Sequence, residues 1–93
     1  MSPPDGGADR SPIRYPTRYP LKVFGLAADD FTAHVQALVE HAGGTGAVEP
    51  PTVRASQGGK YLAVTVVVVL TSEPQRLAIY QALRVDARIV YAL

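Results

Sequence analysis

The longest run of apolar residues in the chain, residues 61–71, alternates between two different faces. One face consists of Leu62, Val64, Val66, Val68 and Leu70. The other consists of Tyr61, Ala63, Thr65, Val67, Val69 and Thr71. The first face is wholly apolar, and the second is mixed but too apolar for plain exposure to solvent. Because β-branched side chains dominate and Gly and Pro are absent, the run predicts a long strand in the middle of a sheet that is covered on both sides.

A second strand and a helix are predicted before this run. Residues 19–26 alternate, with Leu21 and Val23 apolar, and predict a strand. The apolar positions of the next segment are those of an amphipathic helix: Phe31, Val35, Leu38, Val39 and Ala42. Asp29 and Asp30 suit the start of that helix by capping and by charge, and Gly43 and Gly44 suit its end.

The remaining segments predict two weaker strands and a second helix. Residues 48–56 contain Pro50 and Pro51, so this strand belongs at a sheet edge, and residues 56–60 form a hairpin turn. Ser72 and Gln75 have the spacing of a capping box. The helix after them buries Ile79, Tyr80 and Leu83, and residues 88–93 form a short final strand.

The order β-α-β-β-α-β predicts an α+β fold of the ferredoxin-like type. Right-handed crossovers give a four-stranded antiparallel sheet in a two-layer sandwich, with both helices on one face. Residues 19–93 form this domain, and residues 1–18, rich in Pro and Gly, are predicted to be a flexible tail. Since two helices cover only one face, the other face is expected to meet a second chain or a ligand.

Composition narrows the classes of protein. Apolar residues make up 47% and charged residues 18% of 93 residues, the balance of one globular domain. The absence of cysteine excludes disulfides and thiol chemistry. The net charge of +1 gives no reason to expect nucleic acid or an anionic membrane surface. No signal peptide or apolar run of spanning length is visible, so a cytoplasmic location is expected.

Few residues suggest chemistry, and no catalytic residue, metal or cofactor is expected. His34 and His41 lie about 10.5 Å apart along one helix, which suits solvated histidines better than a shared metal. The segment from Gly59 is faintly similar to the sheet motif of RNA-recognition domains. However, Tyr61 is followed by Ala63 where a further aromatic residue would be needed to stack bases, so no nucleic acid is expected.

Several segments resemble the YbeD family of small bacterial proteins of unknown function. The similarity covers about residues 14–93 and includes residues 15–25, the turn from Ser56 to Tyr61, and Ile79, Tyr80 and Leu83. It implies a ferredoxin-like fold similar to the ACT regulatory domains, and an association with lipoate metabolism through gene neighbourhood. It implies no catalytic residues.

Two functions remain open from the sequence. The favoured one is a non-catalytic regulatory or interaction module that self-associates through its sheet and binds a partner enzyme. The alternative is a sensor of a small amino-acid-type ligand at the first strand-to-helix turn: Gly25, Leu26, Ala27, Ala28 and Asp29.

The predicted interface of the favoured function is the uncovered sheet face: Tyr61, Ala63, Thr65, Val67 and Val69. An apolar patch of this kind usually marks an interface, and a homodimer would use one patch in both copies. Either this face or the last strand could form the contact. The competing expectation is that Ile13, Tyr15 and Tyr19 fold over the face within one chain.

Overall fold

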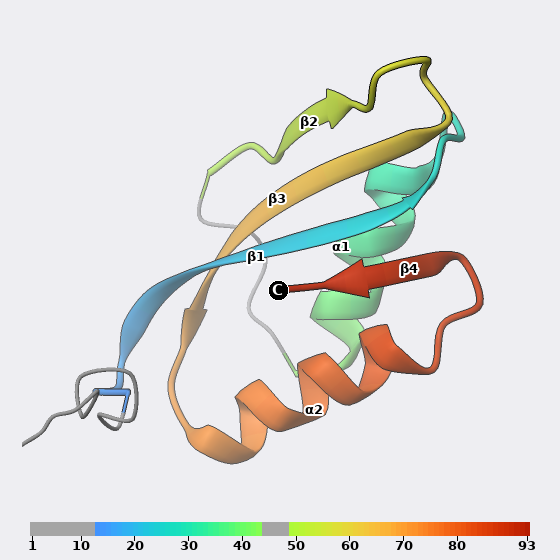
Figure 1. The fold of residues 1–93 in the computed structure, drawn as a ribbon. Helices are drawn as coiled ribbons and strands as arrows, with labels where there is room; N and C mark the ends of the chain where they lie inside the picture. The colour runs from blue at the N-terminus through green and yellow to red at the C-terminus, as the bar shows by residue number, and fades with distance from the viewer. Residues whose placement is uncertain (1–12, 44–48) are drawn as a thin grey trace, which may run out of the picture.

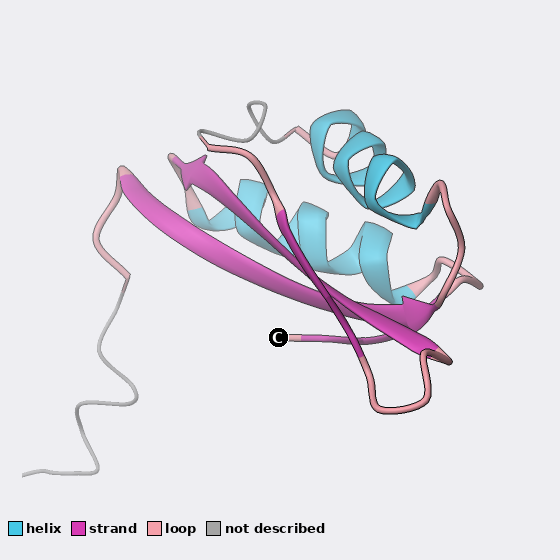
Figure 2. Ribbon diagram, turned by 90° about the horizontal axis from the view of Figure 1, so that it is seen from above, coloured by secondary structure: helices cyan, strands magenta, loops and turns pink. Residues whose placement is uncertain are grey.

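The sheet has the strand order β2-β3-β1-β4, and neighbouring strands are antiparallel. The structure is a computed structural model that describes residues 13–43 and 49–93 (Figure 1). The elements follow one another as β1 (Thr17–Leu26), α1 (Phe31–His41), β2 (Thr52–Ala55), β3 (Tyr61–Leu70), α2 (Glu73–Arg84) and β4 (Ile89–Ala92). Both helices lie on one side of the sheet (Figure 2). The predicted ferredoxin-like α+β fold is therefore confirmed.

The two long central strands determine which side chains face the helices. β1 and β3 pair over ten residues, from Thr17 opposite Leu70 to Leu26 opposite Tyr61. This register turns the wholly apolar face of β3 toward the helices, where it forms one core with β1 and both helices. The fully buried members are Leu21, Val23, Phe31, Val35, Val39, Val64, Val66, Val68, Leu70, Ile79 and Leu83. The predicted strand parity is confirmed, with Leu38 and Leu62 only partly buried at the margin.

Two strands begin at positions that differ from the expected ones. β2 begins at Thr52, directly after Pro50 and Pro51, so the prolines precede the edge strand. β1 begins at Thr17 and includes Pro20. Lys22 exchanges backbone hydrogen bonds with Leu93, so Pro20, two residues earlier, directs its nitrogen toward the same side, beyond the end of β4. A proline is tolerated there because no ladder bond is lost.

The segment before β1 lies against the helix side of the sheet. Tyr19 is opposite the buried Val68, and the Tyr80 hydroxyl donates to the Tyr19 hydroxyl at 3.3 Å. The Tyr15 hydroxyl donates to Glu73 Oε1 at 2.6 Å, at the start of α2. Tyr15 and Tyr19 therefore do not cover the other face, and the expectation that they do so is wrong. Of the tail predicted for residues 1–18, residues 1–12 lie outside the described part of the chain.

The helix ends are held in two different ways. At α2 the Ser72 half of the predicted capping box is present: Ser72 Oγ accepts from the N–H of Gln75 at 3.2 Å. The Gln75 side chain reaches back to accept from the N–H of Thr71 at 2.6 Å. At α1, Asp30 occupies the cap position without a side-chain capping bond, because its carboxylate pairs with Arg88 instead. The predicted capping role of Asp30 is therefore wrong.

Candidate interaction surfaces

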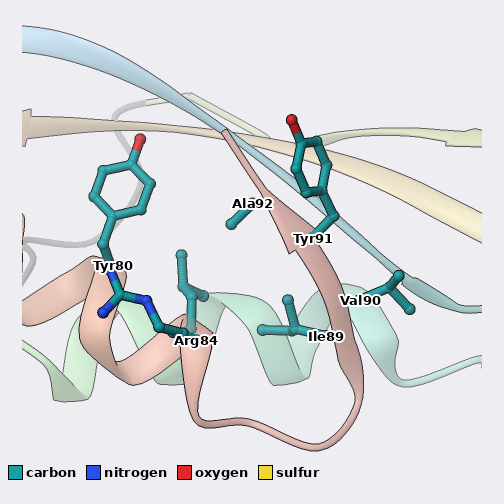
Figure 3. Close-up of a pocket in the computed structure, with 7 residues that line it drawn as sticks. Tyr80, Arg84, Ile89, Val90, Tyr91 and Ala92 are labelled. Atoms are coloured by element: carbon teal, nitrogen blue, oxygen red, sulfur yellow. The ribbon is translucent and has the colours of Figure 1, made fainter.

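The face of the sheet that the helices leave uncovered, here called the open face, carries one continuous row across all four strands. Tyr91 lies opposite Phe24, Phe24 opposite Ala63, and Ala63 opposite Arg54. The rings of Phe24 and Tyr91 have centroids 5.7 Å apart and are tilted by 39°. Tyr91 points away from α2 (Figure 3). The row places aromatic residues at one end and a cation at the other.

The neighbouring row of the open face is polar and basic. Lys22 lies opposite Thr65, and Thr65 lies opposite Thr52. A hollow of about 290 Å³ is lined by Lys22, Arg54, Thr52, Thr65, Val53 and Ala63. A second hollow of about 170 Å³ shares Arg54 and Ala63 with the first, and its further lining includes Phe24, Tyr61, Ala55, Ser56 and Leu62. A basic, hydroxyl-lined depression thus adjoins an aromatic one.

All five residues predicted as an interface lie on the open face. They alternate along β3 with the buried core residues, and the helices cover none of them. Sequence reasoning missed the residues that β1, β2 and β4 add to this face, namely Phe24, Lys22, Arg54 and Tyr91. Alternation with Val23 and Ala92 along the strands could have indicated their face. However, this alternation shows which residues share a face only once the register between strands is known.

A groove separates α2 from β4 (Figure 3). It has a volume of about 260 Å³ and is lined by Tyr80, Leu83 and Arg84 from α2 and by Ile89–Ala92 from β4. Burial, together with the hydrogen bond to Tyr19, raises the pKa of Tyr80 above its ordinary value, so its hydroxyl stays protonated. Val90 is 64% exposed at this edge. The groove therefore follows a sheet edge that no described strand covers.

The turn between β1 and α1 is closely packed around Gly25. A Cβ atom at this position would lie 2.4 Å from the Phe31 ring and 2.5 Å from the carbonyl oxygen of Arg88. The N–H of Ala27 donates to the carbonyl of Lys60 at 2.9 Å. Of the five residues predicted to hold a ligand, Gly25 is buried, whereas Leu26, Ala27, Ala28 and Asp29 are exposed. The space beside Gly25 is filled by protein.

Arg88, from the loop after α2, supplies a cation that the sequence did not associate with this turn. Its Nη2 lies 2.7 Å from Asp30 Oδ1, and its guanidinium carbon lies 5.8 Å from the Phe31 ring centroid. Hydrogen bonds from Arg88 hold the pKa of Asp30 below its ordinary value. At this turn the carboxylate of Asp30 is therefore neutralised by Arg88.

His34 is also paired, which differs from the expected solvated histidine. Its Nε2 lies 2.8 Å from Asp86 Oδ2, and Asp86 Oδ1 accepts from the N–H of Arg88. Burial acts to raise the pKa of Asp86, but the hydrogen bonds from His34 and from that N–H outweigh it and lower the pKa. The Asp30–Arg88 ion pair and the His34–Asp86 hydrogen bond join α1 to the α2–β4 loop. Among residues 13–43 and 49–93, no group of three or more His, Cys, Asp or Glu side chains could hold a metal ion.

Comparison with known proteins identifies relatives over most of the chain. A family described as a protein of unknown function, DUF493, matches residues 10–93. A UPF0250 protein of Ralstonia nicotianae is 42% identical over 74 residues, which cover 76% of this chain and 73% of the relative. A UPF0250 protein of Janthinobacterium is 37% identical over 84 residues, which cover 87% and 89%.

A solved structure supports the fold. The solution structure of protein HP0495 from H. pylori matches with a TM-score of 0.68 and 19% identity, over 100% of this chain and 98% of the other. Neither α1 nor α2 has the length and apolar character of a helix that crosses a membrane. The resemblance to the YbeD family is confirmed, and the chain belongs to the DUF493 (UPF0250) family.

Proposed function

We propose that this protein is a non-catalytic interaction module that self-associates by pairing the β4 strands of two copies. The observation that carries the proposal is the uncovered edge of β4. The strand and the residue after it, Ile89–Ala92 and Leu93, contain no charged side chain and no proline. Although β4 is short and its pairing with β1 shifts register between Phe24 and Gly25, an uncovered edge of this kind offers free N–H and C=O groups to another strand.

The backbone of β4 is oriented for this contact. Lys22 and Leu93 exchange both backbone hydrogen bonds, at 3.3 and 2.8 Å. Because bonded and non-bonded pairs alternate in an antiparallel ladder, the N–H and C=O of Ala92 point away from β1. Two copies related by a twofold axis could join these groups and extend the sheet, with α2 of each copy beside the other.

The other possible contacts are less suited to a second copy. The β2 edge is preceded by Pro50 and Pro51 and carries Arg54, both of which discourage strand pairing. On the open face, Lys22 and Arg54 of one copy would meet no strand carboxylate of the other, since none of the four strands contains Asp or Glu. The β4 edge is therefore favoured over the predicted face of Tyr61 to Val69 as the self-contact.

A regulatory role follows from this proposal as a further hypothesis. The assembly would act in the cytoplasm on a partner enzyme, and the family resemblance makes lipoate metabolism the context to examine first. The proposal assigns no reaction to the chain itself.

Light scattering at several protein concentrations tests the self-association. The wild-type protein is expected to be a dimer at high micromolar concentration, and Val90→Lys is expected to be a monomer, because a charge on an edge strand opposes pairing. Val53→Lys is the matched control, since Val53 is a 48% exposed valine on the opposite edge. A wild-type monomer, or equal dimerisation of both variants, would refute the β4 contact.

The ligand-sensor function is the second candidate, favoured by the position of Arg88. Its guanidinium is the cation that an amino-acid carboxylate at the β1–α1 turn would need, although Asp30 already pairs with it. A thermal-shift screen with amino acids and lipoate precursors tests this function, because a bound ligand raises Tm by mass action. A shift that persists in Arg88→Gln would remove Arg88 from the site.

A further inference from the structure

We infer that the open face binds single-stranded nucleic acid, with phosphates over Lys22 and Arg54 and bases over the aromatic residues beside them. The net charge of +1 and the single aromatic residue counted on β3 predicted the opposite. That prediction used the net charge of the whole chain and the aromatic residues of a single strand. The register between the four strands instead gathers cations and aromatic residues from several strands on one face.

Charge is separated by position in this fold. The four strands contain Arg18, Lys22 and Arg54 and no Asp or Glu. All three cations lie on the open face, opposite Val69, Thr65 and Ala63 respectively. Arg18 pairs with Glu49, whereas no carboxylate of the described residues pairs with Lys22 or Arg54. A surface with two uncompensated cations fits an anionic partner.

Glu49 pairs with Arg18, and three other carboxylates of the described residues pair away from the strands. Asp30, Asp86 and Glu73 pair with Arg88, His34 and Arg76, in the helices and in the loops at their ends. These three carboxylates do not pair with Lys22 or Arg54, so they do not neutralise the cations of the open face. The near-zero net charge of the chain is thus compatible with one basic face.

Aromatic side chains from three strands share this face. Phe24 lies on β1, Tyr61 on β3 and Tyr91 on β4. Phe24 and Tyr91 already contact each other, and Tyr61 has the Lys60 ammonium 5.5 Å from its ring centroid. Tyr91 is 55% and Tyr61 36% exposed, so their rings are accessible. Exposed rings on a rigid sheet are platforms for unstacked bases.

The two hollows of the open face combine these chemistries at adjacent positions. One offers Lys22, Arg54 and two threonine hydroxyls, and the other offers Phe24 and Tyr61, with Arg54 common to both. A partner that repeats an anionic group next to a flat ring matches this arrangement. An acidic polypeptide supplies the charge without the rings, and a duplex keeps its bases stacked on one another.

Fluorescence anisotropy with a labelled single-stranded RNA of about ten nucleotides tests the inference. We expect binding that weakens as salt rises, because phosphate contacts release counterions. Lys22→Gln and Arg54→Gln are each expected to lower the salt slope by about one. Arg84→Gln, an exposed cation on α2, is the matched control and should leave the slope unchanged.

Tyr91→Ser tests the aromatic half of the surface and is expected to weaken binding by at least about fivefold at fixed salt. Circular dichroism checks that the variant is folded. Competition with polyglutamate, with the duplex of the same sequence and with a mononucleotide identifies the partner class. Polyglutamate competing as well as RNA would assign the face to acidic polypeptides and overturn the inference. If the duplex competes as well as the RNA, stacking of unpaired bases on the aromatic residues is excluded. If the mononucleotide competes as well as the RNA, recognition of an extended strand is excluded.

Absence of binding at low salt, or binding that is unchanged in Lys22→Gln, Arg54→Gln and Tyr91→Ser, would also overturn the inference. The self-association proposal fails independently of this one. Val90→Lys acts at the β4 edge and should bind the RNA whether or not the wild-type protein dimerises.

Discussion

At the scale of single residues, Gly25 shows how one position joins three elements. It lies in β1, opposite Leu62 of β3 and Ile89 of β4. The Phe31 ring of α1 and the carbonyl of Arg88 occupy the place of its missing side chain. The groups that approach the backbone closely at this glycine are therefore protein atoms.

Gly25→Ala is expected to destabilise the protein by about 1–3 kcal/mol, because the new methyl group overlaps the Phe31 ring and a backbone oxygen that cannot both move away. Urea denaturation measures the loss. Gly58→Ala is the comparison: nothing lies within 4 Å of its Cβ, so only its φ of 86° opposes the change, at about 1–2 kcal/mol. A neutral Gly25→Ala would contradict the close contact.

Glu73 provides a pH-dependent contribution at the start of α2. Hydrogen bonds from Arg76 and Tyr15 lower the pKa of its carboxyl from 4.5 to about 2. Since the folded-state pKa is depressed, the stabilisation is present above the ordinary pKa and is lost as pH falls from 4.5 toward about 2. The Tm of Glu73→Gln should lie below that of the wild type at pH 7, and the difference should shrink through this window.

Salt provides the control for this prediction. Glu73 is exposed, so added salt should reduce the Tm difference at pH 7 by screening the pair with Arg76. A difference that stays constant from pH 7 to pH 2 would show that the carboxylate charge is not its origin.

At the scale of elements, α2 shows how the spacing of apolar residues along a helix determines which of them pack against the sheet. Its Ser72 cap begins the helix, and one stripe, containing Ile79 and Leu83, is fully buried against the sheet. Leu77 belongs to the same helix but is 54% exposed. Tyr80 lies between these extremes, because it lines the groove beside β4 and bonds to Tyr19.

Leu83→Ala and Leu77→Ala form a matched pair on this helix. Leu83→Ala is expected to cost about 2–5 kcal/mol, because it leaves a cavity in the core. Leu77→Ala should change the free energy of unfolding by no more than about 0.5 kcal/mol. Denaturant titration of both variants measures the difference, and similar losses would refute the assigned helix face.

At the scale of the whole molecule, the two helices cover one face of the sheet at β1 and β3, and they leave the other face and both edge strands, β2 and β4, without a partner among the described residues. β1 and β3 pair over ten residues, whereas β2 and β4 have four residues each. The long pair forms the centre of the sheet. The short outer strands add Arg54, Tyr91 and Ala92 to the residues proposed for partner contacts.

Amide hydrogen exchange rates test both the stability of the central strands and the proposed dimer. The amides of Leu21 and Val66 should be among the slowest to exchange, and those of β2 among the fastest of the strands. The outward N–H of Ala92 should gain protection as protein concentration rises if β4 strands pair. The N–H of Tyr91, bonded within the sheet, is the internal control. Concentration-independent exchange at Ala92 would contradict the pairing.

The sequence by itself determined the fold class, because alternation in strands and the helical period in α1 and α2 are local patterns with one compatible arrangement of layers. The apolar face of residues 62–70, the cap at Ser72 and the edge position of β2 could all be predicted for this reason. The position of Asp30 at the start of α1 was predicted correctly, but its side-chain capping bond and the solvated His34 were not, because Arg88 and Asp86 reach them only through the folding of a distant loop.

Only the tertiary structure decided which side chains share the open face. Phe24, Lys22, Arg54 and Tyr91 are far apart along the chain, and their neighbourhood depends on the register of three strand pairs. A shift of one residue in any pair would move a side chain to the opposite face. Register is set by the packing of the whole core, so the chemistry of this face could not be predicted from any single segment.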